Sequence, residues 1–464
     1  MNRHLPWVLV ALLSLTACSS PPVTQQARDR LSAQWPGATW PDPDTPPAEA
    51  NANGIPLPSG PLSQDEAVRQ ALARHPALRA LVAEGQADAQ STLARSRPRL
   101  LSLHWERARD NDGVELTRAL SLDLLAWLTW PQAHAAAQRA VAERELRLTH
   151  DLWAHLHDTR TQWVRAVAAA EKARYLDDLR ELQAIATELG QRMREAGHLS
   201  PRQLAELQVQ AVQADAARDA AHRQAVLERE ALQQRLGWPA EAAPVQLPER
   251  LPDALALAAD GATAPADLDH RLDVQLARAR WQSVDAEGAH QALRSLVDIE
   301  AGAARSRRDG ETVERSSELG VSLGRVDLGG AERAGARQAS QAAAWRWAAV
   351  RQQAQSEWRA ALTWVTSARQ AEQRARATLL PLQQQLVDER LKQYNGMLVG
   401  PFELLQQARV YREAVLAVID ARRDLWLAEA AVQAAREGTA SGLSALNEPV
   451  TPPAAPASND TAGH

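Results

Sequence analysis

Two kinds of hydrophobic periodicity alternate along this chain, and the same order of elements occurs twice. Apolar residues recur at helical spacing through residues 131–195 and again through 331–393, with almost no Gly or Pro inside either segment. This pattern predicts two long helices. Residues 62–237 and 268–437 are therefore predicted to be two internal structural repeats. Shorter helices are expected at residues 63–97, 203–236, 268–296 and 402–436.

The predicted helix lengths within each repeat fit together. In the first repeat the two shorter helices together match the long one, on the order of 100 Å at 1.5 Å per residue. The second repeat gives the same match, on the order of 95 Å. Each repeat is therefore expected to form a long helical hairpin with one broken arm, and the fold class is mainly α with a small β part.

A second periodicity, with alternating apolar and polar residues, occupies residues 99–124 and 297–324. Leu103 and Trp105 alternate with polar neighbours, a turn follows near Gly113, and the alternation then resumes. The pattern predicts two β-hairpins. Each of the four strands has about the ten residues that a tilted transmembrane strand needs.

Two hairpins cannot close a barrel, and unpaired strand edges are not stable in lipid. The strands are therefore expected to be shared between chains, and three chains would supply a twelve-stranded transmembrane β-barrel. The alternative is a pair of small periplasmic hairpins that cap a helical rod. It draws support from the second hairpin, whose outward positions are Ala301, Ala303 and Arg305.

The N-terminus has the features of a secretory signal at residues 1–17. Its apolar core at residues 5–15 is too short to span a bilayer. It ends in Leu15-Thr16-Ala17-Cys18, which resembles a bacterial lipobox, and Cys18 is the only cysteine in the chain. The motif predicts a lipoprotein acylated at Cys18, with palmitate among its chains; the alternative is a chance cysteine.

Pro-rich and Gly-rich segments mark the boundaries of the repeats. Residues 18–61 are expected to be an extended tether after the lipid, and residues 238–267 a linker between the repeats. Residues 438–464 are rich in Pro, Ala and Ser and are expected to be a disordered tail.

Composition excludes several classes of function. A net charge of −5 without a basic stripe argues against nucleic-acid binding. No catalytic motif is present, so an enzyme is not expected, and the acyl lipid is the only group expected to be attached. The weak candidate for a metal site is Asp151 with His155, and a solvated helix face explains that cluster more simply.

The turns between long and short helices are candidate partner sites. The first turn contains Gly197, Leu199 and Ser200, and the second contains Gly396, Leu398, Val399 and Gly400. Gly197 and Gly396 are expected to take the left-handed conformation that reverses the chain. The leucines and Val399 are expected to be exposed apolar groups that bind a partner, or else to make local contacts within an ordinary hairpin turn.

The chain resembles the TolC family of outer-membrane efflux and secretion ducts over residues 62–435. The resemblance rests on the opening helix at residues 62–79, the strand-to-helix junction at 323–330 and the turn at 394–405. It implies a homotrimer anchored in outer-membrane lipid of a Gram-negative bacterium, with an α-barrel of helical hairpins in the periplasm. A periplasmic adaptor would bind the tips, and an inner-membrane pump would supply the energy.

The resemblance also implies a periplasmic gate just after the second turn. Glu403 matches the first acidic position of the family, whereas Gln406 replaces a common second carboxylate. The alternative role for Glu403 is a solvated carboxylate favoured by the helix dipole. Val399 stands where some members carry a locking basic residue.

The predicted function is the passive exit duct of a tripartite efflux system for small molecules or metal ions. The alternatives are a duct for type I protein secretion and a non-conducting periplasmic scaffold lipoprotein.

Overall fold

The computed structural model describes residues 25–35, 38–41, 60–98, 102–110, 113–239, 241–252, 268–294, 297–308, 311–323 and 330–439. The expected signal peptide, Cys18 and the tail beyond residue 439 lie outside the described residues.

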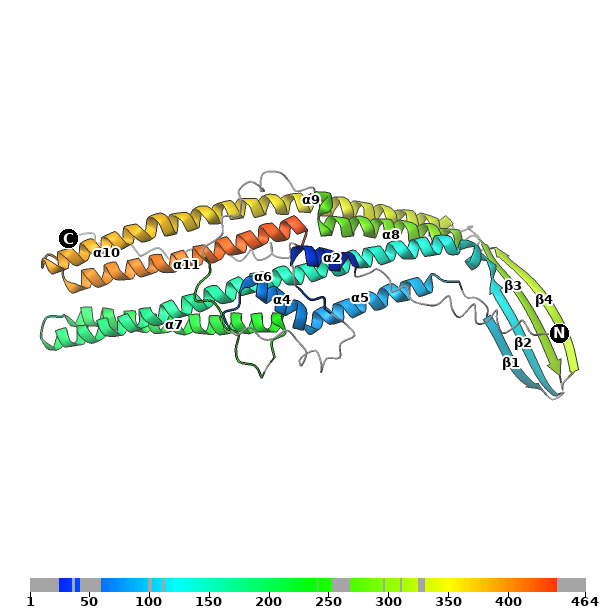
Figure 1. The fold of residues 1–464 in the computed structure, drawn as a ribbon, viewed down its shortest axis with the longest axis horizontal. Coiled ribbons are helices and arrows are strands. Elements are labelled where there is room, and N and C mark those ends of the chain that lie inside the picture. The colour runs from blue at the N-terminus through cyan, green and yellow to red at the C-terminus, as the bar shows by residue number, and fades with distance from the viewer. Residues whose placement is uncertain are drawn as a thin grey trace, which may run out of the picture.

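The described chain is elongated, with a sheet at one end and two helical turns at the other (Figure 1). Helix α6 (Leu124–Glu195) has 72 residues and runs along most of this length. It turns into α7 (Pro201–Leu236) in the first half. The other helices of the two halves are α4 (Gln64–Arg74), α5 (Pro76–Arg95), α8 (Leu272–Arg294), α9 (Gly330–Arg374), α10 (Leu380–Asn395) and α11 (Pro401–Glu437), with a short 3₁₀ turn η4 (Leu268–His270) and a π-helical turn η5 (Ala375–Leu379).

The observed helix boundaries differ from the predicted ones where proline is involved. Pro131 lies inside α6, which begins seven residues before it because Asp123 caps the helix by accepting a hydrogen bond from the Ala126 amide at 2.7 Å. The first short helix is broken at His75, whose extended backbone (φ −66°, ψ 116°) is the conformation favoured before Pro76.

The segment expected to be an extended tether contains helix α2 (Gln25–Gln34), so that prediction was wrong for these residues. Ala27, Leu31 and Trp35 recur at helical spacing and are buried. The Trp35 ring meets the ring of Trp153 on α6 edge-on, with centroids 5.7 Å apart. Burial of this apolar stripe explains why the segment is helical.

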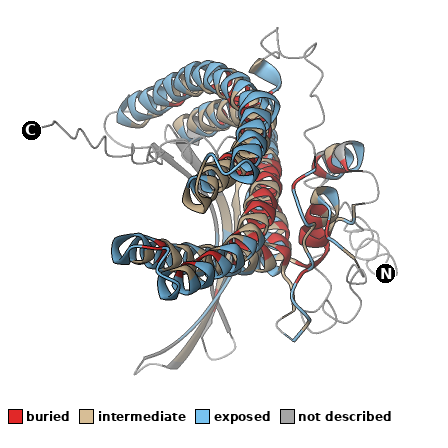
Figure 2. Cartoon of the chain, turned by 90° about the vertical axis from the view of Figure 1, so that its left-hand side faces the viewer, coloured by how far each residue is buried: buried red, intermediate tan, exposed pale blue. Residues whose placement is uncertain are grey.

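The helical core lies along α6. Trp163 is 2% exposed, and its indole Nε1 donates a hydrogen bond to the Leu62 carbonyl at 2.8 Å. Leu232 and Leu236 of α7 belong to the same buried cluster. Buried residues concentrate where α6 meets its neighbours, while the outer faces of the hairpins are exposed (Figure 2). Helix α6 also contacts α8 and α11, so it joins the two halves of the chain.

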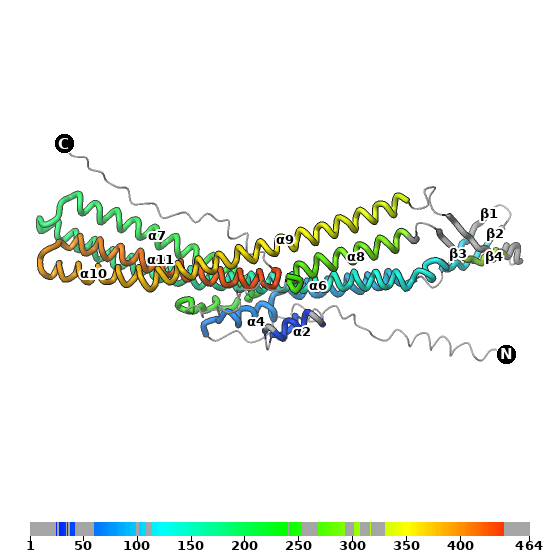
Figure 3. The backbone as a smooth tube through the Cα atoms, turned by 90° about the horizontal axis from the view of Figure 1, so that it is seen from above, coloured from blue at the N-terminus to red at the C-terminus, as the bar shows by residue number. Residues whose placement is uncertain are grey.

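The four strands form one antiparallel sheet in the order β1-β2-β3-β4. They are β1 (Ser102–Asp110), β2 (Gly113–Asp123), β3 (Val297–Arg308) and β4 (Glu311–Leu323). Both predicted hairpins are therefore present in the described residues. Strands β2 and β3 pair with each other, which joins the two hairpins into a single sheet beyond the ends of α6, α8 and α9 (Figure 3). Among the described residues, no helix is both long and apolar enough to cross a membrane.

Candidate functional site

The first turn joins α6 to α7 through a left-handed glycine. Gly197 has φ +78°, and the amide of His198 donates a hydrogen bond to the Met193 carbonyl at 2.8 Å. This bond closes the end of α6 in the pattern that requires a left-handed residue. Ser200 then starts α7 with a reciprocal capping box to Gln203. The predicted role of Gly197 in reversing the chain is confirmed.

Leu199 is 3% exposed, so the prediction that it projects from the tip was wrong. Its side chain folds back into the hairpin beside Gly190 of α6 and Leu207 of α7. A Cβ at Gly190 would lie 2.4 Å from Leu207 Cδ1 and 3.5 Å from Leu199 Cδ2. The glycine therefore gives the two leucines room to pack, and the first turn keeps its apolar residue inside.

The second turn reverses the chain at a different residue from the one predicted. Gly396 has φ −82°, an ordinary value, whereas Met397 has φ 57°. The amide of Leu398 donates a hydrogen bond to the Gln393 carbonyl at 2.9 Å, as His198 does to Met193 in the first turn. The residue that corresponds to Gly197 is therefore Met397.

The second turn exposes its apolar side chains. Met397 is 94% exposed and Leu398 is 78% exposed, while Val399 is half-buried. Adjacent exposed side chains of this size at a chain reversal are typical of a contact surface. Sequence reasoning identified Leu398 but missed Met397, and the signal available was its offset of three residues from Gly400, the same as that of Gly197 from Ser200.

Glu403 lies in the first turn of α11, where a carboxylate is favoured by the helix dipole. A Cβ at Gly400 would lie 2.9 Å from its Oε2 atom, so the carboxylate folds back over the start of the helix. Gln406 is exposed on the next turn of the same helix. The structure therefore presents both residues at the tip, on the helix that follows the exposed turn.

Ion pairs hold the second hairpin against α6. Lys172 Nζ lies 3.0 Å from an Asp420 carboxylate oxygen, and Arg422 Nη1 lies 3.4 Å from Glu171. Burial raises the pKa of Glu171, partly offset by a hydrogen bond from the Leu251 amide and by Arg422. These contacts join the middle of α11 to α6.

Asp151 and His155 do not meet as a metal site. Asp151 lies 2.9 Å from Nδ1 of His150. The ring of His155 instead packs on His75 and lies 3.4 Å from the Arg235 carbonyl. Among the described residues there is no group of three or more His, Cys, Asp or Glu side chains arranged to hold a metal ion.

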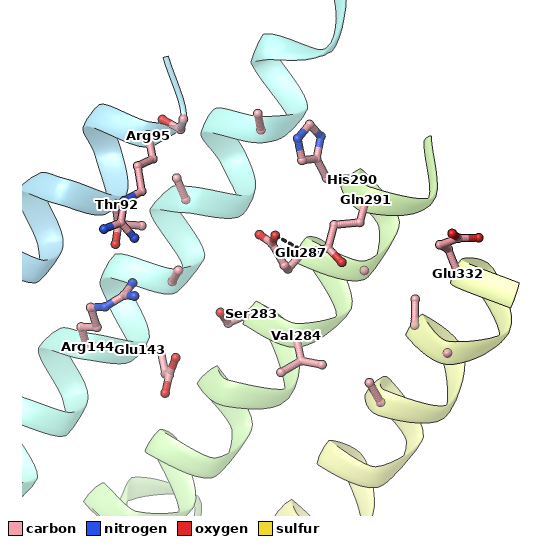
Figure 4. Close-up of a pocket in the computed structure, with 18 residues that line it drawn as sticks. Thr92, Arg95, Glu143, Arg144, Ser283, Val284, Glu287, His290, Gln291 and Glu332 are labelled. Carbon is pink, nitrogen blue, oxygen red and sulfur yellow. Dashed lines mark hydrogen bonds between the residues drawn. The ribbon is translucent and has the colours of Figure 1, made fainter. Parts of the chain in front are cut away.

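A pocket of about 790 Å³ lies near the sheet, between α5, α6, α8 and α9 (Figure 4). Alanines contribute much of its lining, and its polar side chains come from all four helices, with Glu287 accepting a hydrogen bond from Gln291 at 2.7 Å. No predicted site residue lines this pocket.

Exposed leucine stripes near the tips were not predicted. On α6 the stripe is Leu182, Ile185 and Leu189, and on α10 and the preceding turn it is Leu379, Leu382 and Leu386. In both cases the spacing of three and four residues places them on one helix face. Their pattern was visible in the sequence, but it could not be separated from that of intramolecular core positions.

No family model matches the sequence, and no curated protein matches it. Solved structures do share its fold. The CmeC outer membrane channel of Campylobacter jejuni has a TM-score of 0.70 at 13% identity, over 83% of this chain and 88% of that one. A membrane protein from Pseudomonas aeruginosa has a TM-score of 0.67 at 17% identity, over 82% of this chain and 96% of that one. The open-state MtrE outer membrane channel of Neisseria gonorrhoeae has a TM-score of 0.62 at 15% identity, over 84% of this chain and 94% of that one. The resemblance predicted from the sequence is therefore confirmed at the level of the fold.

Proposed function

We propose that this chain, which has the fold of outer-membrane channels, is the trimeric exit duct of a tripartite efflux system. It would passively release small molecules or metal ions from the periplasm of a Gram-negative bacterium. The observation that carries the proposal is the separation of two surfaces along one rod. The sheet lies at one end and the two helical turns lie at the other (Figure 1). One face of the sheet carries exposed apolar side chains, and so does the second turn.

The two faces of the sheet differ as those of a channel wall do. Leu103 and Trp105 are 71% and 68% exposed on one face, hereafter the apolar face. On the other, hereafter the polar face, His104 lies 3.6 Å from Glu106. Apolar residues toward lipid and polar residues toward water are what a transmembrane strand requires. This alternation supports a membrane location for the sheet.

The open edges of the sheet support assembly into a trimer. Strands β1 and β4 each pair on one side only within the described sheet. Edges in lipid must find partners, and three copies would close a twelve-stranded barrel. The exposed leucine stripes on α6 and α10 supply apolar surface for helices of neighbouring copies to pack on, forming the α-barrel.

The exposed turn supports binding of a periplasmic adaptor, which would connect the duct to an inner-membrane pump. Met397 and Leu398 would form the apolar contact, and Gly197, Ser200, Gly396, Val399 and Gly400 would shape the two turns around it. Three copies of Glu403 around the axis would form a ring that attracts cations, with Gln406 as a neutral second layer. Acylation of Cys18 would add a lipid anchor to the membrane attachment.

The test is a susceptibility panel on a deletion strain, covering copper, silver, zinc, cobalt, antibiotics, bile salts and dyes. Hypersensitivity to one class, rescued by the wild-type gene, would identify the cargo. Leu398→Asp should fail to rescue because it places a charge on the adaptor contact. Leu398→Met keeps the apolar surface and should rescue.

Planar-bilayer conductance separates the alternatives. A duct should conduct, and a Glu403→Ala/Gln406→Ala variant should alter its cation selectivity. A scaffold would give no conductance in either form. Conductance without any change in susceptibility would instead favour the type I protein secretion duct.

A further inference from the structure

Among the strand residues whose side chains are described, the two faces of the sheet differ in charge. Among strand residues with described side chains, the carboxylates Glu106, Glu115 and Asp123 occupy the polar face, together with Thr117 and Ser121. The arginines Arg107, Arg118 and Arg305 all fall on the apolar face, because side chains of paired residues point to the same side. The apolar face therefore carries cationic side chains and, within this part of the sheet, no carboxylate.

The backbone register aligns two of these arginines, Arg118 and Arg305, in one row across the sheet. Trp105 pairs with Arg118, Arg118 pairs with Arg305, and Arg305 pairs with Arg315. Arg118 is exposed and Arg305 is half-buried. The row formed by Trp105, Arg118 and Arg305 is called the arginine row below.

The arginine row borders an apolar belt. On the side toward the helices, Leu103 pairs with Leu120, and Leu120 pairs with Ala303. Leu122 and Ala301 form the next apolar pair, just before α6 begins. Along β3 the distance from its first residue to Arg305 is on the order of 27 Å. This is close to the span of about nine to eleven residues that takes a tilted strand across a bilayer.

A row of like charges attracts anions. Like charges directly opposite on neighbouring strands destabilise a sheet, and arginine facing lipid is tolerated near the interface but costly at the bilayer midplane. Guanidinium groups bind phosphate through two parallel hydrogen bonds. Trp105 is an aromatic residue of the kind that marks membrane interfaces. Membrane lipids at such a boundary present phosphorylated headgroups.

We propose that the arginine row binds the phosphate groups of the anionic lipid that surrounds the sheet, with Arg118 and Arg305 as the ligands. This inference rests on the proposed function, since it requires the apolar face to contact lipid. It adds a specific lipid site to that function. The row would then fix the depth of the sheet in the membrane.

The test measures binding of lipid A to the purified full-length protein in detergent micelles by native mass spectrometry. Wild type should bind lipid A, and its dephosphorylated form should bind far more weakly. Arg118→Gln/Arg305→Gln should weaken lipid A binding by about tenfold or more, because charge-assisted bidentate bonds are lost. Arg118→Lys/Arg305→Lys should retain part of the affinity. The matched control is Arg223→Gln, an exposed arginine on α7.

Equal affinity of wild type and the double glutamine variant for lipid A would overturn the inference. So would equal binding of lipid A and dephosphorylated lipid A by wild type, a comparison that needs no variant to fold. Displacement of lipid A by millimolar inorganic phosphate would show an anion site without lipid specificity and would also overturn it. Conductance is scored separately. If the protein conducts but does not bind lipid A, only this inference is wrong. If wild type gives no conductance, the proposed function is wrong.

Discussion

Gly197 and Met397 occupy the same position in the two helical turns, and both have left-handed backbone, with φ +78° and 57°. Each precedes the residue whose amide closes the helix end, His198 in one turn and Leu398 in the other. Glycine takes this conformation without steric cost, whereas a residue with a Cβ atom takes it at a cost of roughly 1–2 kcal/mol. The second turn thus holds an exposed methionine in a strained conformation, which is a feature of functional positions.

Removing the side chain at position 397 and adding one at position 197 should have opposite effects on stability. Met397→Gly should raise the free energy of unfolding by up to about 1 kcal/mol, because the strain is released. Gly197→Ala should lower it by about 1 kcal/mol. No atom lies within 4 Å of a Cβ at Gly197, so the effect there is conformational alone. Chemical denaturation followed by circular dichroism measures both.

Met397→Gly should also weaken binding of the proposed periplasmic adaptor while it stabilises the fold, since it removes the most exposed apolar side chain of the turn. Met397→Leu separates the two effects because it keeps the apolar surface and the strain. If Met397→Gly left both adaptor affinity and stability unchanged, the hypothesis that this turn holds a strained Met397 as a partner contact would be wrong.

Gly190→Ala should destabilise the first hairpin, although alanine favours helix. The added Cβ would lie 2.4 Å from Leu207 Cδ1, so the leucines must repack at a cost of about 1–3 kcal/mol. The matched control is Gly335→Ala on α9, where nothing lies within 4 Å and a gain of up to about 1 kcal/mol is expected from propensity. Thermal melts of both variants decide, and a stabilised Gly190→Ala would contradict the packing described for Leu199.

Arg271→Met should be strongly destabilising. Arg271 is 1% exposed, and its guanidinium contacts Asp273 at 2.7 Å and Glu357 at 2.6 Å. Removal of the cation leaves two carboxylates without it at a partly buried site, a cost of about 3–5 kcal/mol. The neighbouring exposed pair of Arg351 and Asp269, 3.7 Å apart, is the control, and Arg351→Met should cost about 1 kcal/mol or less. If urea denaturation showed similar losses of unfolding free energy for Arg271→Met and Arg351→Met, the buried ion pairs would be no more important than the exposed one.

The protein should lose stability between about pH 6.5 and pH 4 through His75. Burial, with smaller contributions from His155 and Arg235, lowers the pKa of His75 to about 4. A histidine with a depressed pKa binds its proton more readily when unfolded, so its contribution is present above the unfolded value and lost as pH falls. The full effect is up to about 3 kcal/mol.

His75→Gln should therefore flatten the acid limb of a stability-versus-pH curve over that interval. The ring of His75 lies 4.5 Å from that of His155, whose pKa is also lowered by burial, so a residual slope is expected from His155. An acid limb as steep in His75→Gln as in wild type would exclude His75 as its source.

The sequence predicted most of the elements but not all of their limits. Helical spacing and alternation are local properties, so both hairpins and both long helices were found. Helix α6 begins seven residues before the predicted start at Pro131, because proline usually stands at the first helical position but here lies inside the helix. Helix α2 was not predicted, because its three apolar residues are stabilised by packing on a distant part of the chain that includes Trp153.

Among the candidate tip residues, too, some features follow from the local sequence and others depend on tertiary contacts. Gly197 has the left-handed conformation and Leu398 the exposed side chain that local turn chemistry predicts. Leu199 and Leu398 look alike in sequence, yet one packs beside Gly190 and the other is exposed, because the two hairpins offer different neighbours.

The sequence by itself determined the repeated order of helices and strands, the positions of the turns and the alternation of the strands, since these follow from backbone preferences and periodicity over a few residues. Only the tertiary structure decided which strands pair. The pairing of β2 with β3 sets Arg118 opposite Arg305, nearly two hundred positions apart in the chain. Register depends on contacts between distant segments, and a shift of one residue would move every side chain to the other face. The distribution of charge between the two faces is therefore a property of the folded sheet.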